Sequence, residues 1–230
     1  MEETIKEYNL HKENIKSRLN DFKKLSEKEK FHELLFCLLT PQSNAKKCWE
    51  AVKEISLLNK FSLENIINIL KTKTRFHNNK ARYIIEAKDK WNKISLLLKN
   101  KDIYIPINRI TKKRECIDRD SLKKCNTIIG NLCIFELRNE LAEEIKGFGL
   151  KEASHFLRNI GLSNNKIAIL DRHILRNLVN YNIIPETKIK NKKDYFEKEK
   201  LFLKFSQEIN IPLDEIDLLF WQRETGEIFK

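Results

Sequence analysis

Turn-forming residues are scarce in this sequence, which has five glycines and four prolines among 230 residues. Where the pattern is regular, apolar residues recur at spacings of three and four, as in Phe31, Leu34 and Leu38. This spacing places them on one face of an amphipathic helix. The sequence therefore predicts an all-α fold.

The expected helices follow one another without an obvious linker. Helices are expected near residues 31–39, 46–58, 63–71, 79–98, 131–145, 151–160, 172–180, 195–209 and 212–225. Breaks are expected at Pro41 and around residues 74–79, 99–121, 147–149, 161–166 and 185–193. Because no repeat or low-complexity segment separates them, we expect residues 1–230 to form one domain whose helices divide into two lobes.

Long apolar runs are also missing. No stretch approaches 18 consecutive apolar residues, and the acidic N-terminus, Met1–Thr4, lacks the apolar segment of a signal peptide. We therefore expect neither a membrane-spanning segment nor secretion.

The cysteines do not form a metal-binding pattern. Cys37, Cys48, Cys116, Cys125 and Cys133 include no CxxC pair and have no matching histidine spacing, so a structural zinc site is not expected. The last three are near enough in sequence to pair or to ligate a metal, and the alternative is that all five are free thiols. Free thiols predict a reducing, intracellular compartment.

Basic residues outnumber acidic residues in this sequence. Lys and Arg number 45 against 33 Asp and Glu, which gives a formal net charge of +12, and the excess is greatest between Lys60 and Lys124. A polyanionic partner follows, and both nucleic acid and an acidic membrane surface fit. The alternative is that a Lys-rich composition produces only solvated helix faces.

Residues 145–153 read IKGFGLKEA, in which two glycines flank one apolar residue between two amphipathic segments. This is a helix-hairpin-helix pattern, expected at about residues 134–160. Gly147 and Gly149 permit a tight turn and bring backbone N–H groups close to a phosphate at a helix N-terminus, while Phe148 fills the space between the helices. The pattern predicts a DNA-backbone anchor, and the alternative is a glycine-capped helix junction without a ligand.

Two reactive side chains follow this hairpin. Lys151 lies in the first turn of the second helix, where it is held beside the bound backbone, although it could equally contact only a phosphate or solvent. Asp171 follows the apolar run 167–170 at the start of another helix. It is an N-cap candidate, and a helix cap is also a rigid mount for a catalytic carboxylate.

Four sequence blocks resemble the type-2 8-oxoguanine DNA glycosylases of the helix-hairpin-helix DNA glycosylase superfamily. They read FCLLTPQS (36–43), RFHNNKAR (75–82), KEASHFLRN (151–159) and DRH (171–173), and the similarity extends to nearly the whole chain. The resemblance implies two helical lobes with the helix-hairpin-helix element at the cleft, as in the endonuclease III-like glycosylase fold. The chain departs from the pattern between its hairpin and Asp171, where the loop has no proline and is slightly longer at residues 163–166.

The resemblance also assigns roles to single residues. The lysine after the hairpin and the downstream aspartate, which are the family's catalytic pair, match Lys151 and Asp171. The C-terminal lysine that distinguishes 8-oxoguanine from guanine matches Lys230, and a nearby tryptophan matches Trp221. No cofactor is implied, and an iron–sulfur cluster is not expected because no cysteine follows Cys133.

The implied chemistry is base release followed by strand cleavage. The Lys151 amine attacks C1′ and displaces the base, and the resulting Schiff base permits β-elimination, while Asp171 stabilises positive charge on the sugar. The expected base pocket consists of Pro41, Gln42, Ser43, Trp221 and Lys230. An acceptor there would select the N7–H donor of 8-oxoguanine.

Alternatives remain for the pocket and for the function. Gln42 fits a polar helix end, Trp221 fits core packing, and Lys230 fits a frayed terminus. The chain could also be a non-catalytic DNA-binding module, or a monofunctional glycosylase in which Asp171 activates water, but Lys151 argues against both. The expected partner is double-stranded DNA containing an oxidised purine, bound by a monomer.

Overall fold

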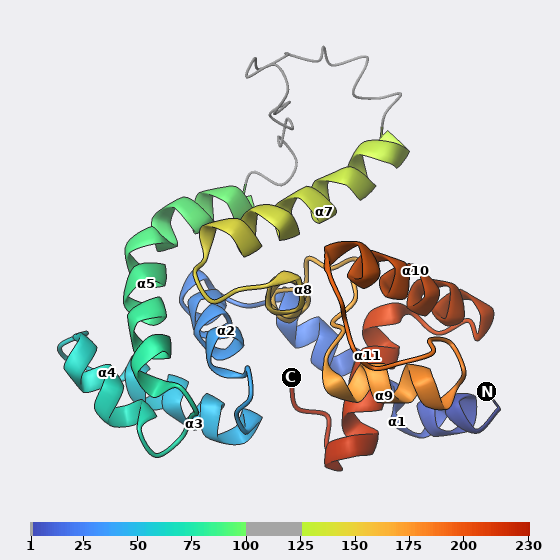
Figure 1. Ribbon diagram of the computed structural model, residues 1–230, viewed down its shortest axis with the longest axis horizontal. Helices are drawn as coiled ribbons and strands as arrows, with labels where there is room; N and C mark the ends of the chain where they lie inside the picture. The colour runs from blue at the N-terminus through green and yellow to red at the C-terminus, as the bar shows by residue number, and fades with distance from the viewer. Residues whose placement is uncertain (1, 100–125) are drawn as a thin grey trace. The chain divides into compact units, whose positions relative to one another are not determined.

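The computed structural model describes residues 2–99 and 126–230, with side chains from residue 134 onward in the second range. Within these ranges the chain forms ten helices and no strands (Figure 1), so the all-α prediction is confirmed. The chain divides into two compact units. Unit 1 consists of Met1–Ser26 and Ser154–Lys230, and unit 2 consists of Glu27–Ala153.

The core of unit 2 is formed by the apolar run of a single helix. Its elements are α2 (Glu27–Leu39), α3 (Ala45–Ser56), α4 (Leu63–Leu70), α5 (His77–Lys99), α7 (Asn126–Glu144) and the start of α8 (Leu150–Asn159). Helix α2 packs on α3 and α5, and α4 packs on the same two helices. The run Leu34–Leu39 is buried throughout, so the C-terminal half of α2 forms the core of this unit.

Unit 1 is built around its last helix. Its elements are α1 (Glu2–Lys23), the rest of α8, α9 (Arg172–Asn180), α10 (Lys192–Glu208) and α11 (Leu213–Thr225). Helix α11 packs against α1, α9 and α10, and its residues 213–220 are all buried. Among them, Asp217 forms a buried ion pair with Arg158 Nη2 at 3.0 Å, so each charge faces one of opposite sign inside the core.

Helix α1 was not among the expected helices. Only Thr4, Tyr8, Ile15 and Phe22 are buried along its 22 residues, so the apolar stripe is too sparse to stand out in the sequence. Its place is determined by long-range contacts instead, since the Tyr8 hydroxyl donates a hydrogen bond to Glu215 of α11. Tertiary packing therefore creates this helix where local pattern does not predict it.

The remaining helices overlap their expected positions, with errors at polar first turns. Helix α10 begins at Lys192, three residues early, because the Asn191 side chain caps it by accepting from the Asp194 N–H at 3.0 Å. Helix α5 extends to Lys99, where the break at 99–121 was expected to begin. The rest of that break, the basic residues from 100 to 124, and the side chains of Cys116, Cys125 and Cys133 lie outside the described residues. Cys37 and Cys48 are buried free thiols.

In the described ranges, no helix combines the length and the hydropathy that a membrane span requires.

Candidate functional site

The predicted hairpin forms the turn between α7 and α8 in unit 2. The Phe148 N–H donates to the Ile145 carbonyl at 3.0 Å, and Phe148 itself is buried. Gly147 has a φ of +95°, and a Cβ at this position would lie 2.5 Å from Cδ2 of the Tyr83 ring. Both the backbone conformation and the close approach of the ring therefore require glycine at 147.

The second hairpin glycine has a different environment. The Gly149 N–H donates to Oε2 of Glu152 at 3.0 Å, and the Gly149 carbonyl accepts from the Ala153 N–H at 3.0 Å. This arrangement is one half of a capping box, in which a carboxylate at the third helical position returns to the cap. A phosphate that uses the Gly149 donor must therefore displace Glu152.

Lys151 occupies the first turn of α8, and its side chain is 24% exposed. Its Nζ lies 3.4 Å from Oε1 of Glu152, so one carboxylate contacts both the hairpin amide and the lysine. Two further titratable groups of unit 2, Lys80 and Cys48, lie close enough to Lys151 for its charge to lower their pKa values. The predicted nucleophile therefore has neighbours of both signs.

The Thr40–Asn44 turn between α2 and α3 carries three of the predicted pocket residues. The Ser43 N–H donates to the Thr40 carbonyl at 3.0 Å, and Gln42 adopts a left-handed conformation with φ of +55°. The Gln42 side chain is exposed. Ser43 Oγ accepts from the Arg75 N–H at 3.0 Å, which ties this turn to the segment before α5.

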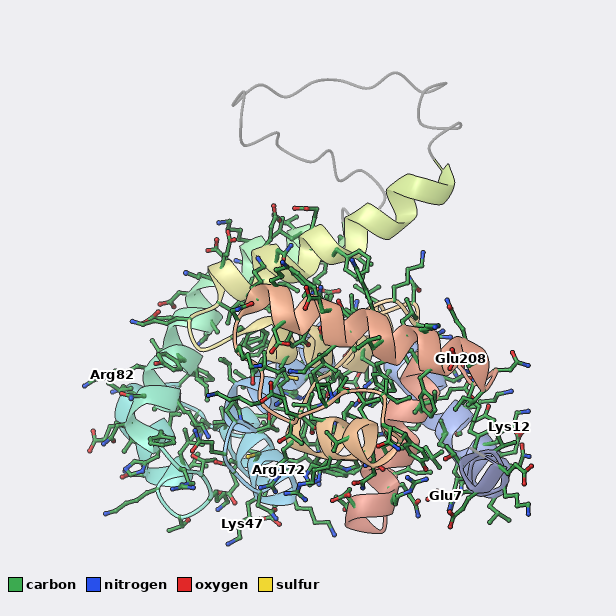
Figure 2. All side chains as sticks on the ribbon, turned by 45° about the vertical axis from the view of Figure 1, so that its right-hand side comes forward. Glu7, Lys12, Lys47, Arg82, Arg172 and Glu208 are labelled. Atoms are coloured by element: carbon green, nitrogen blue, oxygen red, sulfur yellow. The ribbon has the colours of Figure 1, made fainter. Side chains whose placement is uncertain are left out.

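Lys80 of α5 is the residue around which this turn is arranged. Its Nζ donates to the Leu39 carbonyl at 2.7 Å, to the Pro41 carbonyl at 2.8 Å and to Ser43 Oγ at 2.9 Å. The side chain is 4% exposed, whereas Arg82, two residues later, extends away from the ribbon (Figure 2). Of these two cations on one helix, Lys80 is therefore buried and Arg82 is exposed to solvent.

The surroundings of Lys80 change its acidity and that of Cys48. Burial lowers the pKa of the Lys80 ammonium to about 8, and the nearby charges of Lys151 and Arg75 act in the same direction. The neighbouring Cys48 thiol opposes them. Burial raises the pKa of that thiol to about 11, and its Sγ donates to the Leu39 carbonyl at 3.2 Å.

Asp171 caps α9 in unit 1, as one reading of the sequence expected. Its Oδ1 accepts from the N–H groups of His173 at 2.8 Å and Ile174 at 2.9 Å. Within the described ranges, Oδ2 has no hydrogen-bond partner. The cap thus fixes the carboxylate and leaves one oxygen available to another group.

The segment that leads to Asp171 is clamped by α10. Residues 167–170 are buried, and both backbone groups of Ala168 are paired with side chains of that helix. The Ala168 N–H donates to Oε1 of Glu199 at 2.7 Å, and the Ala168 carbonyl accepts from the Tyr195 hydroxyl at 2.7 Å. These two contacts determine where the chain delivers Asp171.

Trp221 of α11 lies against the same end of α9. Its ring meets that of His173 edge to face, with centroids 5.2 Å apart, and the His173 Nδ1 lies 3.2 Å from Oε2 of Glu224. The Trp221 Nε1 is buried and has no hydrogen-bond partner among the described residues. Trp221 is thus connected to the Asp171 cap through His173.

The C-terminal segment is held in place. Gly226 ends α11 in a left-handed conformation, and the Phe229 carbonyl accepts from Arg18 Nε of α1 at 2.7 Å. Lys230 is only 5% exposed. The C-terminus is therefore not frayed, which was the alternative interpretation of Lys230.

The predicted residues fall into one group in each unit. Pro41, Ser43 and Lys151 share the surroundings of Lys80 in unit 2, whereas Asp171, Trp221 and Lys230 belong to unit 1. Sequence reasoning did not identify the supporting residues Lys80, Glu152, Tyr195 and Glu199. For Lys80 a signal was present, because this lysine shares the apolar face of Ile84 and Ala87.

Comparison with known proteins gives consistent similarities over the full chain. The family model described as 8-oxoguanine DNA glycosylase matches residues 15–117 and 105–211. A protein of Fusobacterium nucleatum named 8-oxoguanine DNA glycosylase/AP lyase is 37% identical over 238 residues, covering 100% of this chain and 96% of its own length. A protein of the same name from Metallosphaera sedula is 35% identical and covers 93% of this chain and 89% of its own length.

Solved structures are similar over the same extent. The 8-oxoguanine DNA glycosylase of Thermotoga maritima has a TM-score of 0.78 at 28% identity, covering 100% of this chain and 97% of that one. The 8-oxoguanine glycosylase/lyase of Methanocaldococcus jannaschii, solved in complex with 15mer DNA containing 8-oxoguanine, has a TM-score of 0.76 at 30% identity and covers 100% of both chains.

Proposed function

The chain belongs to the 8-oxoguanine DNA glycosylase family, and from this we propose that it excises 8-oxoguanine from DNA and then nicks the abasic site by β-elimination. The observation that carries the proposal is the match of the whole chain to a relative named 8-oxoguanine DNA glycosylase/AP lyase. The lysine in the first turn after the hairpin agrees with it, because a lyase of this kind needs an amine nucleophile.

We assign the nucleophile to Lys151. Its neutral amine forms a bond to C1′ of the damaged nucleotide while the bond from C1′ to the base breaks, and the departing base takes that electron pair and a proton. The sugar then opens to a Schiff base between Lys151 and C1′. Loss of a C2′ proton breaks the bond from C3′ to its phosphate oxygen, which nicks the strand.

The surroundings of Lys151 bear on its protonation. An attacking amine must lose its proton before it forms a bond. The Glu152 carboxylate lies 3.4 Å from the Lys151 Nζ, and the charge of Lys151 lowers the pKa of Lys80. If a DNA phosphate takes the Gly149 N–H from Glu152, the carboxylate must change its contacts at the moment when the substrate binds.

We assign charge stabilisation on the sugar to Asp171. Departure of the base leaves positive charge at C1′ and the ring oxygen, and a fixed carboxylate stabilises it. The helix cap holds Oδ1 with two backbone N–H groups, and Oδ2 has no partner among the described residues. This division of the two oxygens makes the structural and the catalytic role compatible.

The remaining assignments concern recognition. Gly147, Phe148 and Gly149 form the backbone anchor, and the base pocket comprises Pro41, Gln42, Ser43, Trp221 and Lys230. The scheme needs no metal or organic cofactor. We further propose that both units act together as one glycosylase domain, and that the protein works as a monomer on duplex DNA in a reducing, intracellular compartment.

Borohydride trapping tests this function most directly. The wild type is mixed with a duplex containing one 8-oxoguanine, and with the same duplex carrying guanine, and the covalent product is compared with that of Lys151→Gln. Lys146→Gln is a matched control, because Lys146 belongs to the same hairpin but is exposed and paired with Glu86. We expect a covalent complex only with the lesion, in the wild type and the control.

Each alternative has its own outcome in this experiment. A non-catalytic binding module would bind both duplexes in a salt-sensitive manner and release no base. A monofunctional glycosylase would release 8-oxoguanine without any covalent complex, and Lys151→Gln would then retain base release. Trapping that persists in Lys151→Gln would assign the Schiff base to another amine.

A further inference from the structure

Lys80 is a buried cation whose partners are all neutral. A lysine is rarely buried without a carboxylate, because removing its charge from water is costly unless the ammonium group is fully hydrogen-bonded. The three acceptors of the Lys80 Nζ are the carbonyls of Leu39 and Pro41 and the Ser43 hydroxyl. An ammonium group has three N–H donors, so all three are used.

All three acceptors belong to one short piece of chain. They lie within five residues at the end of α2 and in the Thr40–Asn44 turn, whereas Lys80 lies on α5, about 40 positions later. Between the second and third acceptors, Gln42 adopts its left-handed conformation. A non-glycine residue keeps such a conformation only when its surroundings enforce it, and the Lys80 ammonium supplies that constraint.

The same ammonium is near enough to the proposed nucleophile for the charge of Lys151 to lower the pKa of Lys80. The titratable and charged groups that act on Lys80 come from three elements: Cys48 on α3, Lys151 on α8 and Arg75 before α5. Burial raises the pKa of the Cys48 thiol to about 11, so this neighbour is neutral near pH 7 and supplies no negative charge to the Lys80 ammonium.

We propose that Lys80 is a positioning residue of the glycosylase reaction, which holds the Pro41–Ser43 turn in its base-selecting conformation. This inference rests on the proposed function. It adds a residue that contacts neither the base nor the sugar and acts through the groups that do.

Two substitutions separate the hydrogen bonds of Lys80 from its charge. Lys80→Met removes the donors and the charge at similar length, whereas Lys80→Gln removes the charge and retains two N–H donors. Lys88→Met is the matched control, because Lys88 lies on the same helix, is exposed, and contacts only the Phe61 ring among the described residues. Each variant is first compared with the wild type by thermal unfolding.

The readouts are single-turnover base release and lesion preference. Preference is the ratio of Kd values for a guanine duplex and for one carrying 2′-fluoro-8-oxoguanine, whose glycosidic bond resists cleavage. We expect Lys80→Met to slow base release by roughly 100-fold, the cost of misplacing a reacting group by about 1 Å, and to reduce the preference. Lys80→Gln should retain more of the preference.

Lesion preference distinguishes a positioning role from a purely structural one. A purely structural role would lower the unfolding temperature of both Lys80 variants without changing the ratio of the two Kd values. Unchanged preference in both variants, with only a lower unfolding temperature, would overturn the inference. If the wild type itself releases no 8-oxoguanine, the proposed function fails and this inference fails with it.

Discussion

Buried side chains of opposite charge hold backbone segments in the two units. In unit 2 the Lys80 ammonium donates to two backbone carbonyls and a hydroxyl. In unit 1 the Glu199 carboxylate accepts from the Ala168 N–H at 2.7 Å. In each unit, one buried charged side chain is thus hydrogen-bonded to a segment that carries or leads to a proposed site residue.

The two segments held in this way carry different parts of the proposed site. Lys80 holds the turn with Pro41 and Ser43, and Glu199 holds the segment that leads to Asp171. The Arg158–Asp217 pair of unit 1 is the contrasting case, since it joins two side chains of opposite charge in the core. Core packing and site positioning therefore use buried charge differently.

The substitution with the largest expected effect is Asp171→Asn. The amide oxygen can still accept from the N–H groups of His173 and Ile174, so the free energy of unfolding should change by less than about 1 kcal/mol. Base release should fall by roughly 100- to 1000-fold, because the stabilising charge is lost. Thermal unfolding and single-turnover kinetics measure the two effects. A base-release rate that falls only as far as the folded fraction falls would show that Asp171 acts only as a helix cap.

The clamp on residues 167–170 provides the next test. Tyr195→Phe removes the donor to the Ala168 carbonyl, which should lower the free energy of unfolding by about 1 to 3 kcal/mol, since the carbonyl remains buried. We also expect slower base release, because the Asp171 carboxylate shifts. Phe202→Leu on the same helix is a control for general loss of packing, because the Phe202 ring stacks on Phe220. A rate unchanged at a temperature where the variant is fully folded would contradict the positioning role.

Glu152→Gln tests the carboxylate that contacts Lys151. The amide oxygen can still accept from the Gly149 N–H, but the negative charge that a DNA phosphate must displace is gone. We expect about 2- to 5-fold tighter binding to undamaged duplex, the effect of one charge at a helix N-terminus. Fluorescence anisotropy at fixed salt measures it, with Glu143→Gln as a nearby control. Weaker binding would show that Glu152 supports the anchor.

The smallest expected effect is a pH dependence of stability. Because burial lowers the pKa of Lys80 to about 8, the unfolded chain binds more protons than the folded chain between pH 8 and the ordinary lysine range. Stability contributed by this group should therefore rise with pH, by roughly 1 kcal/mol between pH 7 and 8.5. The rise should be absent in Lys80→Met, when unfolding free energies of the two proteins are compared across this window.

Local pattern was sufficient for most of the fold and for the outline of the site. Apolar periodicity located nearly all the helices, the two glycines located the hairpin, and the residue after a buried run identified Asp171 as a cap. The catalytic roles of Lys151 and Asp171, and the membership of the base pocket, stay predictions. They depend on where DNA lies, which neither the periodicity nor the fold specifies.

The contacts that local pattern could not supply are the long-range ones. Lys80 meets the Pro41 carbonyl across 39 positions, and Glu199 meets the Ala168 N–H across 31. A lysine on an apolar helix face signals a buried cation, but its acceptors are backbone groups that carry no sequence signature. The position of helix α1 also depends on long-range contacts, because its Tyr8 pairs with Glu215, 207 positions away.

The hairpin glycine at 147 limits how the chain can evolve. The Tyr83 ring occupies the space of the missing side chain, so a smaller residue at 83 would open a void beside the turn. No side chain at 147 can fill it, because the φ of +95° excludes all but glycine at low cost. A genetic screen for second-site suppressors of Tyr83→Ala should therefore recover changes at other positions and none at 147.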